Sequence, residues 1–255
     1  MELDFTLNHA EGYKSGSQIA RRITEAWATQ NLFCAECPSG TLAPTPPNTK
    51  AIDFICPTCN SPYQLKASKT WNERRIPDAG FNAMMSAIKS DRVPNLFVLQ
   101  YAPVGRVINL LLIPSFFFAA SSIQKRKPLS PKARRAGWVG CNILLSAIAP
   151  EGKIRIIKNG QIISSPRKVR VCVQRGKPVG TIIPKKRGWV LDVLNLVHAI
   201  ERPDFTLQDV YKRESELKSL HPNNQNIRAK IRQQLQILRD LRLITFQGQG
   251  KYRIV

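Results

Sequence analysis

The chain has 255 residues, enough for two domains that each bury a core. Its 39 lysines and arginines against 17 acidic residues give a net charge of +22, and its 43% hydrophobic content excludes disorder throughout. The most apolar stretch, residues 107–120, is interrupted by polar residues and proline and is shorter than the roughly 20 residues of a membrane helix, so we expect no membrane span.

The positive charge is concentrated in one segment. Residues 125–187 carry 17 basic side chains and a single acidic one, Glu151. Such a segment repels itself unless a polyanion covers it, which favours nucleic acid as the partner. An anionic membrane surface and a merely solvated basic surface are the alternatives. Residues 1–30 lack the apolar core of a signal peptide, so we expect a reducing cytoplasm, in a prokaryote, and no disulfide framework.

Periodicity and turn signals predict the elements of the first half. In chain order we expect a helix at 17–30, a Pro-rich loop at 38–50, strands at 51–55 and 62–66, a helix at 78–90 capped by Asp78, and a hairpin of strands 95–101 and 106–113.

The second half begins with the basic loop 125–142 and a hairpin around Asn159-Gly160. A linker is expected at 177–188. Helices at 189–200, 207–220 and 224–243 are followed by a terminal hairpin, which is the order of a winged helix. We therefore expect a first domain at 1–183 and a winged-helix domain at 184–255.

Two CxxC pairs have the spacing of a structural zinc site. Cys34 and Cys37 are separated by 18 residues from Cys56 and Cys59. Each pair places two thiolates on a tight turn, and two such turns complete a tetrahedron around zinc without an open position. The remaining cysteines, Cys141 and Cys172, are expected to be small core residues.

A candidate active site surrounds the second CxxC pair. Asp53 precedes the pair, and Gln64 and Lys66 follow it. If the flanking strands pair, Gln64 and Lys66 share a face and Asp53 lies beside them. Asp53 and the Gln64 amide oxygen suit Mg²⁺, while Lys66 suits the developing charge of phosphodiester hydrolysis. A solvated edge strand is the alternative for so short a pattern.

Two long segments resemble the DpnI-like family of methyl-directed type II restriction endonucleases: KPLSPKARRAGWVGCNI at 127–143 and IRQQLQILRD with GKYR within 231–253. The CxxC pairs fall where that family has its zinc site. The resemblance implies an α/β (α+β) PD-(D/E)xK nuclease domain with an embedded zinc site and a C-terminal winged helix. It also implies Mg²⁺-dependent cleavage of double-stranded DNA at GATC sites with methylated adenine.

The resemblance implies that Asp53 and Lys66 occupy the Asp and Lys positions of the PD-(D/E)xK motif. Gln64 replaces the acidic residue that is usual between them. An amide oxygen can still ligate Mg²⁺, but the lost charge should lower metal affinity. Glu25 on the first helix is a possible substitute carboxylate, although an ordinary exposed glutamate is the preferred interpretation.

Two elements are candidates for reading DNA. In the loop, Trp138 offers a flat surface to the adenine methyl group, and Arg134 and Arg135 suit phosphate or guanine; anchoring of the loop by Trp138 is the alternative. The second element is the polar face of the third C-terminal helix together with the wing. Its candidate DNA-contacting residues are Arg228, Arg232, Gln233, Gln236, Arg239 and Lys251. A solvated helix face is the alternative there.

Three functions remain open at this point. The first is a methyl-directed endonuclease that acts on DNA, expected to be a monomer in solution. The second is a catalytically weak or inactive reader of methylated DNA, which Gln64 favours. The third is a zinc protein associated with RNA or the ribosome. The three histidines are scattered, and no histidine-based nucleophile or metal centre is expected.

Overall fold

The computed structural model describes residues 1–6, 12, 14–46, 49 and 51–255. Part of the expected Pro-rich loop, residues 47, 48 and 50, lies outside this description. The chain forms two compact units, each built from three stretches. Unit 1 comprises Met1–Asn72, Pro94–Ser115 and Glu151–Lys177, and unit 2 comprises Glu73–Val93, Phe116–Pro150 and Pro178–Val255.

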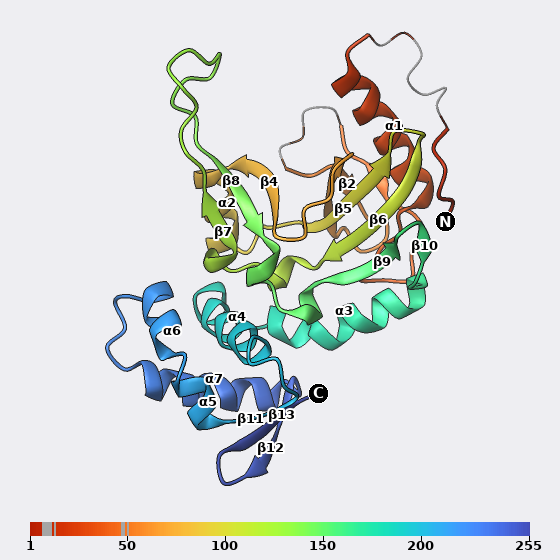
Figure 1. Ribbon diagram of the computed structural model, residues 1–255. Helices are drawn as coiled ribbons and strands as arrows, with labels where there is room; N and C mark the ends of the chain where they lie inside the picture. Colours follow the sequence, from red (N-terminus) through yellow and green to blue (C-terminus); the bar gives the residue numbers. More distant parts are fainter. Residues whose placement is uncertain (7–11, 13, 47–48, 50) are drawn as a thin grey trace. The chain divides into compact units, whose positions relative to one another are not determined.

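A seven-stranded sheet is the centre of unit 1 (Figure 1). Its strands, in sheet order, are β1 (Ala43–Pro44), β2 (Phe54–Ile55), β3 (Pro62–Ser68), β5 (Asn95–Ala102), β6 (Arg106–Ile113), β9 (Ile154–Lys158) and β10 (Gln161–Ile162). All neighbours are antiparallel except β3 and β5, which are parallel. The two expected hairpins, β5–β6 and β9–β10, are present, and Asn159 and Gly160 take the positive φ angles that such a tight turn requires.

Among its described residues, unit 1 also contains two helices. Helix α1 (Gly16–Asn31) buries Trp27, whose ring lies against Phe5. Phe5 in turn contacts Tyr101 of β5, so that the helix is held on the sheet by aromatic side chains. Helix α3 (Pro166–Gly180), most of which belongs to unit 1, buries Val169 and Val173.

Unit 2 contains a three-stranded antiparallel sheet in the order β4 (Arg75–Gly80), β8 (Gly140–Leu144) and β7 (Ile123–Lys125). Helix α2 (Phe81–Lys89) follows β4 directly. The expected cap at Asp78 was wrong, because Asp78 pairs with Cys141 within the sheet and Gly80 precedes the helix. Short 3-10 turns occupy Ser115–Phe117, Ala120–Ser122, Leu145–Ala147 and Pro150–Gly152.

The rest of unit 2 has the arrangement of a winged helix (Figure 1). The elements are α4 (Pro184–His198), β11 (Asp204–Thr206), α5 (Leu207–Tyr211), α6 (Glu214–Leu220), α7 (Ile227–Asp240), β12 (Ile244–Gly248) and β13 (Lys251–Ile254). The strands form a sheet in the order β11-β13-β12. Thr206 caps α5 by accepting from the Asp209 backbone N–H, as the sequence predicts.

Two predicted boundaries were wrong. The expected linker at 177–188 is largely helical, because Pro178 lies in the last turn of α3 and Pro184 begins α4. The expected single helix at 207–220 is divided into α5 and α6 at Lys212 and Arg213. Within the described ranges, none of the helices combines the length and the apolar composition needed to cross a bilayer.

Candidate functional site

The four predicted zinc ligands come together in unit 1. The sulfur atoms of Cys34, Cys37, Cys56 and Cys59 all lie within 4.8 Å of one another. The Sγ–Sγ distances are 3.5 Å for both Cys34–Cys59 and Cys37–Cys56. A tetrahedron with Zn–S bonds of about 2.3 Å has edges of about 3.8 Å, so the cluster fits a zinc ion. This four-cysteine cluster suggests structural zinc.

Backbone hydrogen bonds around the cluster lower the pKa of the Cys56 thiol. Burial raises the pKa of Cys56, but hydrogen bonds from the backbone N–H groups of Cys59 and Thr58 outweigh it and bring the pKa to about 6. Burial raises the pKa of Cys34 to about 12. A zinc ion therefore has to displace the Cys34 proton, a cost that the charge of the cation offsets.

Side chains from two other elements fix the first CxxC turn. The buried Tyr63 of β3 accepts a hydrogen bond of 2.9 Å from the backbone N–H of Ala35. Arg170 of α3 donates to the carbonyl oxygens of Cys34 and Ser39, at 2.9 and 2.8 Å. The cluster therefore links the loop after α1 with both β3 and α3.

Asp53 is placed by the same two strands that flank the second CxxC pair. Its backbone N–H donates to Tyr63 O at 2.9 Å, and its carboxylate Oδ2 accepts from the backbone N–H of Leu65 at 2.8 Å. Because backbone N–H groups of a strand lie close to the plane of the sheet, this carboxylate lies at the end of β2, beside the edge of β3.

Gln64 and Lys66 lie on β3, one residue on either side of Leu65, and both are half-buried. Alternation places them on one face of the strand, with Leu65 and Ala67 on the other. In the parallel register Gln64 is opposite the buried Leu96 and Lys66 is opposite the buried Val98.

A hollow of about 360 Å³ opens beside Asp53. The β3 residues that line it are Leu65 and Ala67, which lie on the opposite face of the strand from Gln64 and Lys66. The other lining residues come from α1 and β5: Ser17, Ala20, Arg21, Thr24, Glu25 and Tyr101. Of the three predicted motif residues, Asp53 lines this hollow, whereas Gln64 and Lys66 are not among its lining residues.

Glu25 lies at the hollow beside Asp53, although its sequence pattern indicated an ordinary exposed glutamate. Its side chain is 30% exposed, lines this hollow with Asp53 and forms a 2.7 Å ion pair with Arg21. The hydrogen bond from Arg21 to Glu25 raises the Arg21 pKa, and the nearby Asp53 charge adds to the effect. Arg21 was missed because an exposed i,i+4 Arg–Glu pair on a helix is commonplace.

The predicted reading loop joins β7 to β8. Arg134 and Arg135 are exposed, and the Arg135 guanidinium lies 4.5 Å from the centroid of the half-buried Trp138 ring. The ring packs so closely on Gly140 that an added Cβ would lie 2.9 Å from it. Trp138 thus helps to anchor the base of the loop while part of its ring remains exposed.

The polar face of α7 is exposed as predicted, while Ile227, Ile231, Leu235 and Leu238 are buried. Several of its polar groups already have partners within unit 2. Arg228 pairs with Glu214, Arg232 donates to the Tyr211 hydroxyl, Gln233 accepts from Lys230, and Arg239 pairs with Asp240. The exposed Gln236 and Lys251 complete the predicted set. Arg228 and Arg239 must exchange an acidic partner for DNA if they contact it.

One histidine forms a network that resembles a catalytic triad only in composition. His221 lies 2.7 Å from the Asp192 carboxylate and stacks on Trp189, and Ser121 donates its hydroxyl to the same carboxylate. The Ser121 hydroxyl donates to Asp192 and not to the His221 imidazole. The histidine therefore cannot act as the base that activates the serine. It ties α4 to the turn that precedes α7.

The comparison with protein families decides the identity of both halves. The model of the DpnI Dam-replacing family matches residues 1–179, more than half of the chain, and the Dam-replacing HTH domain of DpnI matches residues 185–254. The chain belongs to the DpnI Dam-replacing family.

DpnI-family proteins are methyl-directed restriction endonucleases with a PD-(D/E)xK-like domain. Membership confirms the predicted family and the predicted fold class, a mixed α/β domain with a four-cysteine cluster followed by an HTH-type domain. DNA binding is implied by both matches.

Proposed function

We propose that this DpnI-family protein cleaves double-stranded DNA at GATC sites that carry methylated adenine, by Mg²⁺-dependent phosphodiester hydrolysis. Hydrolysis is assigned to residues 1–183, and residues 184–255 contribute to recognition. The observation that carries the proposal is the position of Asp53, held at the end of β2 by the Leu65 N–H, directly beside the Gln64–Lys66 segment of β3.

Asp53 and Gln64 offer hard oxygen atoms, which fit Mg²⁺ and distinguish this site from the sulfur ligands of the cysteine cluster. When bound, Mg²⁺ supplies polarisation of the phosphate and a lowered pKa for a bound water. Lys66 would orient the attacking water and stabilise the charge that develops on the phosphate. Burial of the neighbouring β5 side chains gives this part of the sheet a lower dielectric, which strengthens these interactions.

Restoring the acidic residue at position 64 should strengthen metal binding. In Gln64→Glu the added charge is expected to lower the Mg²⁺ concentration for half-maximal cleavage by about tenfold, since ligand charge tunes the affinity of carboxylate sites. The measurement is a Mg²⁺ titration of initial cleavage rates. Gln64→Ala, which removes the oxygen, should raise the Mg²⁺ concentration for half-maximal cleavage. Equal midpoints in the wild type and both variants would show that Gln64 is not a metal ligand.

Trp138 is proposed to contact the adenine methyl group, with Arg134 and Arg135 contacting phosphate or guanine. Trp138→Ala should lower the ratio of cleavage rates on methylated and unmethylated duplexes by about tenfold or more, the value typical of one buried methyl-sized contact. Trp138→Phe keeps a flat apolar ring and should retain most of the discrimination. A ratio that is unchanged in Trp138→Ala would show that the ring serves only as the anchor on Gly140.

A reader of methylated DNA that does not cleave is the second candidate, favoured by Gln64. Incubation of the purified protein and Mg²⁺ with plasmid of each methylation state separates the two functions. Cutting confined to methylated plasmid supports the endonuclease. Tight methyl-dependent binding to uncut plasmid supports the reader.

A further inference from the structure

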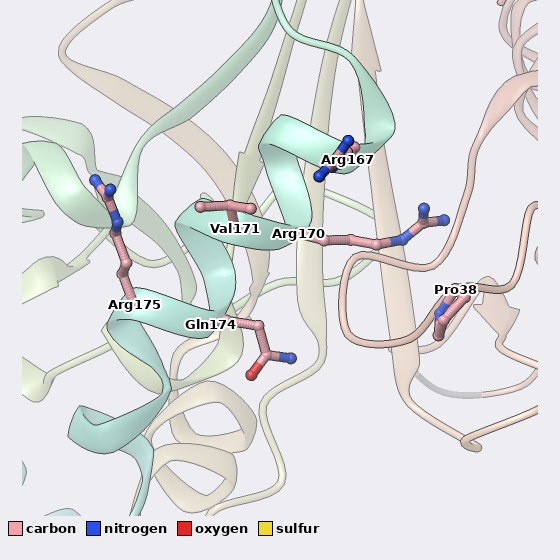
Figure 2. Close-up of a pocket in the computed structure, with 6 residues that line it drawn as sticks. All are labelled: Pro38, Arg167, Arg170, Val171, Gln174 and Arg175. Carbon is pink, nitrogen blue, oxygen red and sulfur yellow. The ribbon is translucent and has the colours of Figure 1, made fainter.

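Helix α3 presents a strongly basic surface to solvent. Its 15 residues include Arg167, Lys168, Arg170, Arg175 and Lys177 and no acidic side chain. We call these five residues the α3 basic surface. An open hollow on it is lined by Pro38, Arg167, Arg170, Val171, Gln174 and Arg175 (Figure 2).

Two of the five cations are engaged within unit 1. Arg170 reaches the first CxxC turn and holds its carbonyl groups, and Lys177 lies 3.9 Å from Glu36. Figure 2 shows Arg170 extending toward the loop that carries Pro38, whereas Arg175 points the other way. Arg170 therefore fixes the helix against the cysteine cluster.

The positive charges of the other three residues are not neutralised by acidic side chains among the described residues. Arg167, Lys168 and Arg175 are exposed, and in the part of the chain that the structure describes they form no ion pair. Like charges at this density on one helix destabilise the folded state. A partner that carries negative charge would relieve this repulsion.

The spacing of the arginines favours a polymer over a small anion. Arg167 and Arg175 are eight residues apart, which corresponds to about 12 Å along the helix axis. Val171 and Pro38 contribute apolar surface to the hollow between them. Arginines at this spacing are suited to contacting two different phosphates of one nucleic acid strand or duplex.

We propose that the α3 basic surface binds the phosphate backbone of duplex DNA outside the recognised site. The proposal rests on the DNA binding of the proposed function. The hollow is lined by residues other than the proposed catalytic and base-reading ones, so this contact adds affinity and carries no sequence information.

The test uses the full-length zinc-containing protein with Arg167→Gln and Arg175→Gln combined. Binding to a long methylated duplex is measured at a series of salt concentrations without Mg²⁺. Loss of two phosphate contacts should make the slope of log K against log salt shallower by about 1.8. The affinity should fall by the same factor for unmethylated DNA, and the effect should disappear on a duplex trimmed to the recognised site.

Two matched variants complete the experiment. Lys14→Gln with Lys89→Gln removes the same charge from exposed positions outside α3 and should leave the slope close to that of the wild type. Arg167→Lys with Arg175→Lys keeps the charge and should keep the slope. Zinc content and thermal unfolding confirm that each protein is folded.

A double glutamine variant with the wild-type slope, or with a change no larger than that of the Lys14 and Lys89 control, would overturn the inference while leaving the proposed function intact. A wild-type protein that does not bind DNA would overturn both.

Discussion

Lys66→Ala is expected to reduce cleavage of methylated DNA by at least about a hundredfold, the typical cost of removing one group that stabilises charge in the transition state. Binding of the methylated duplex should change little, because the reading surfaces lie on other elements. Single-turnover cleavage at saturating protein, together with equilibrium binding without Mg²⁺, separates the two quantities.

Lys69→Ala provides the matched control. Lys69 follows β3 directly and is exposed, so its removal changes the net charge equally without touching the proposed motif. Its cleavage rate should remain near that of the wild type. If Lys66→Ala also cuts at the wild-type rate, the assignment of the active site to β3 is wrong.

Removal of Cys56, one of the four proposed zinc ligands, should have the largest effect on stability. Structural zinc contributes about 10 kcal/mol or more in small zinc-binding domains, comparable to the whole stability of a typical domain. We expect Cys56→Ser to contain less than one zinc per chain, to unfold at a much lower temperature and to lose cleavage, since β2 and β3 are joined through the second CxxC turn. Metal analysis and thermal unfolding measure these effects.

Cys172→Ser is the control for this prediction. Cys172 is half-buried on α3 and is not part of the four-cysteine cluster, so one zinc per chain and the wild-type unfolding temperature are expected. The absence of zinc in a stable, active wild-type protein would contradict the structural role of the cluster.

Local sequence signals predicted the elements that depend on near neighbours. The hairpin at Asn159-Gly160 follows from the positive φ angles that these residues tolerate. The cysteine cluster follows from the spacing of two CxxC turns, because each turn orients its own pair of thiols. The helical segments and the terminal hairpin of the winged helix follow from apolar periodicity and the Thr206 cap, whereas strand β11 was not predicted.

Features that depend on distant residues were not predicted. The parallel pairing of β3 with β5 joins strands that are separated by β4 and α2, and no turn signal encodes it. Helix α3 was missed because no element was predicted at 166–176 and a linker was predicted to start with Lys177 and Pro178, whereas Arg170 and the buried Val169 and Val173 hold it in unit 1. The hollow shared by Glu25 and Asp53 likewise requires α1 to pack near β3, which single-helix periodicity does not show.

The central claim is that Asp53 and Gln64 hold a metal ion at the junction of β2 and β3. Anomalous diffraction from crystals of the complex with methylated DNA and Mn²⁺ tests it directly. We predict a peak about 2.0–2.2 Å from an Asp53 carboxylate oxygen and from Gln64 Oε1, with Lys66 Nζ near the scissile phosphate. A metal peak bound elsewhere in unit 1, with Gln64 and Lys66 turned away from both metal and phosphate, would contradict it.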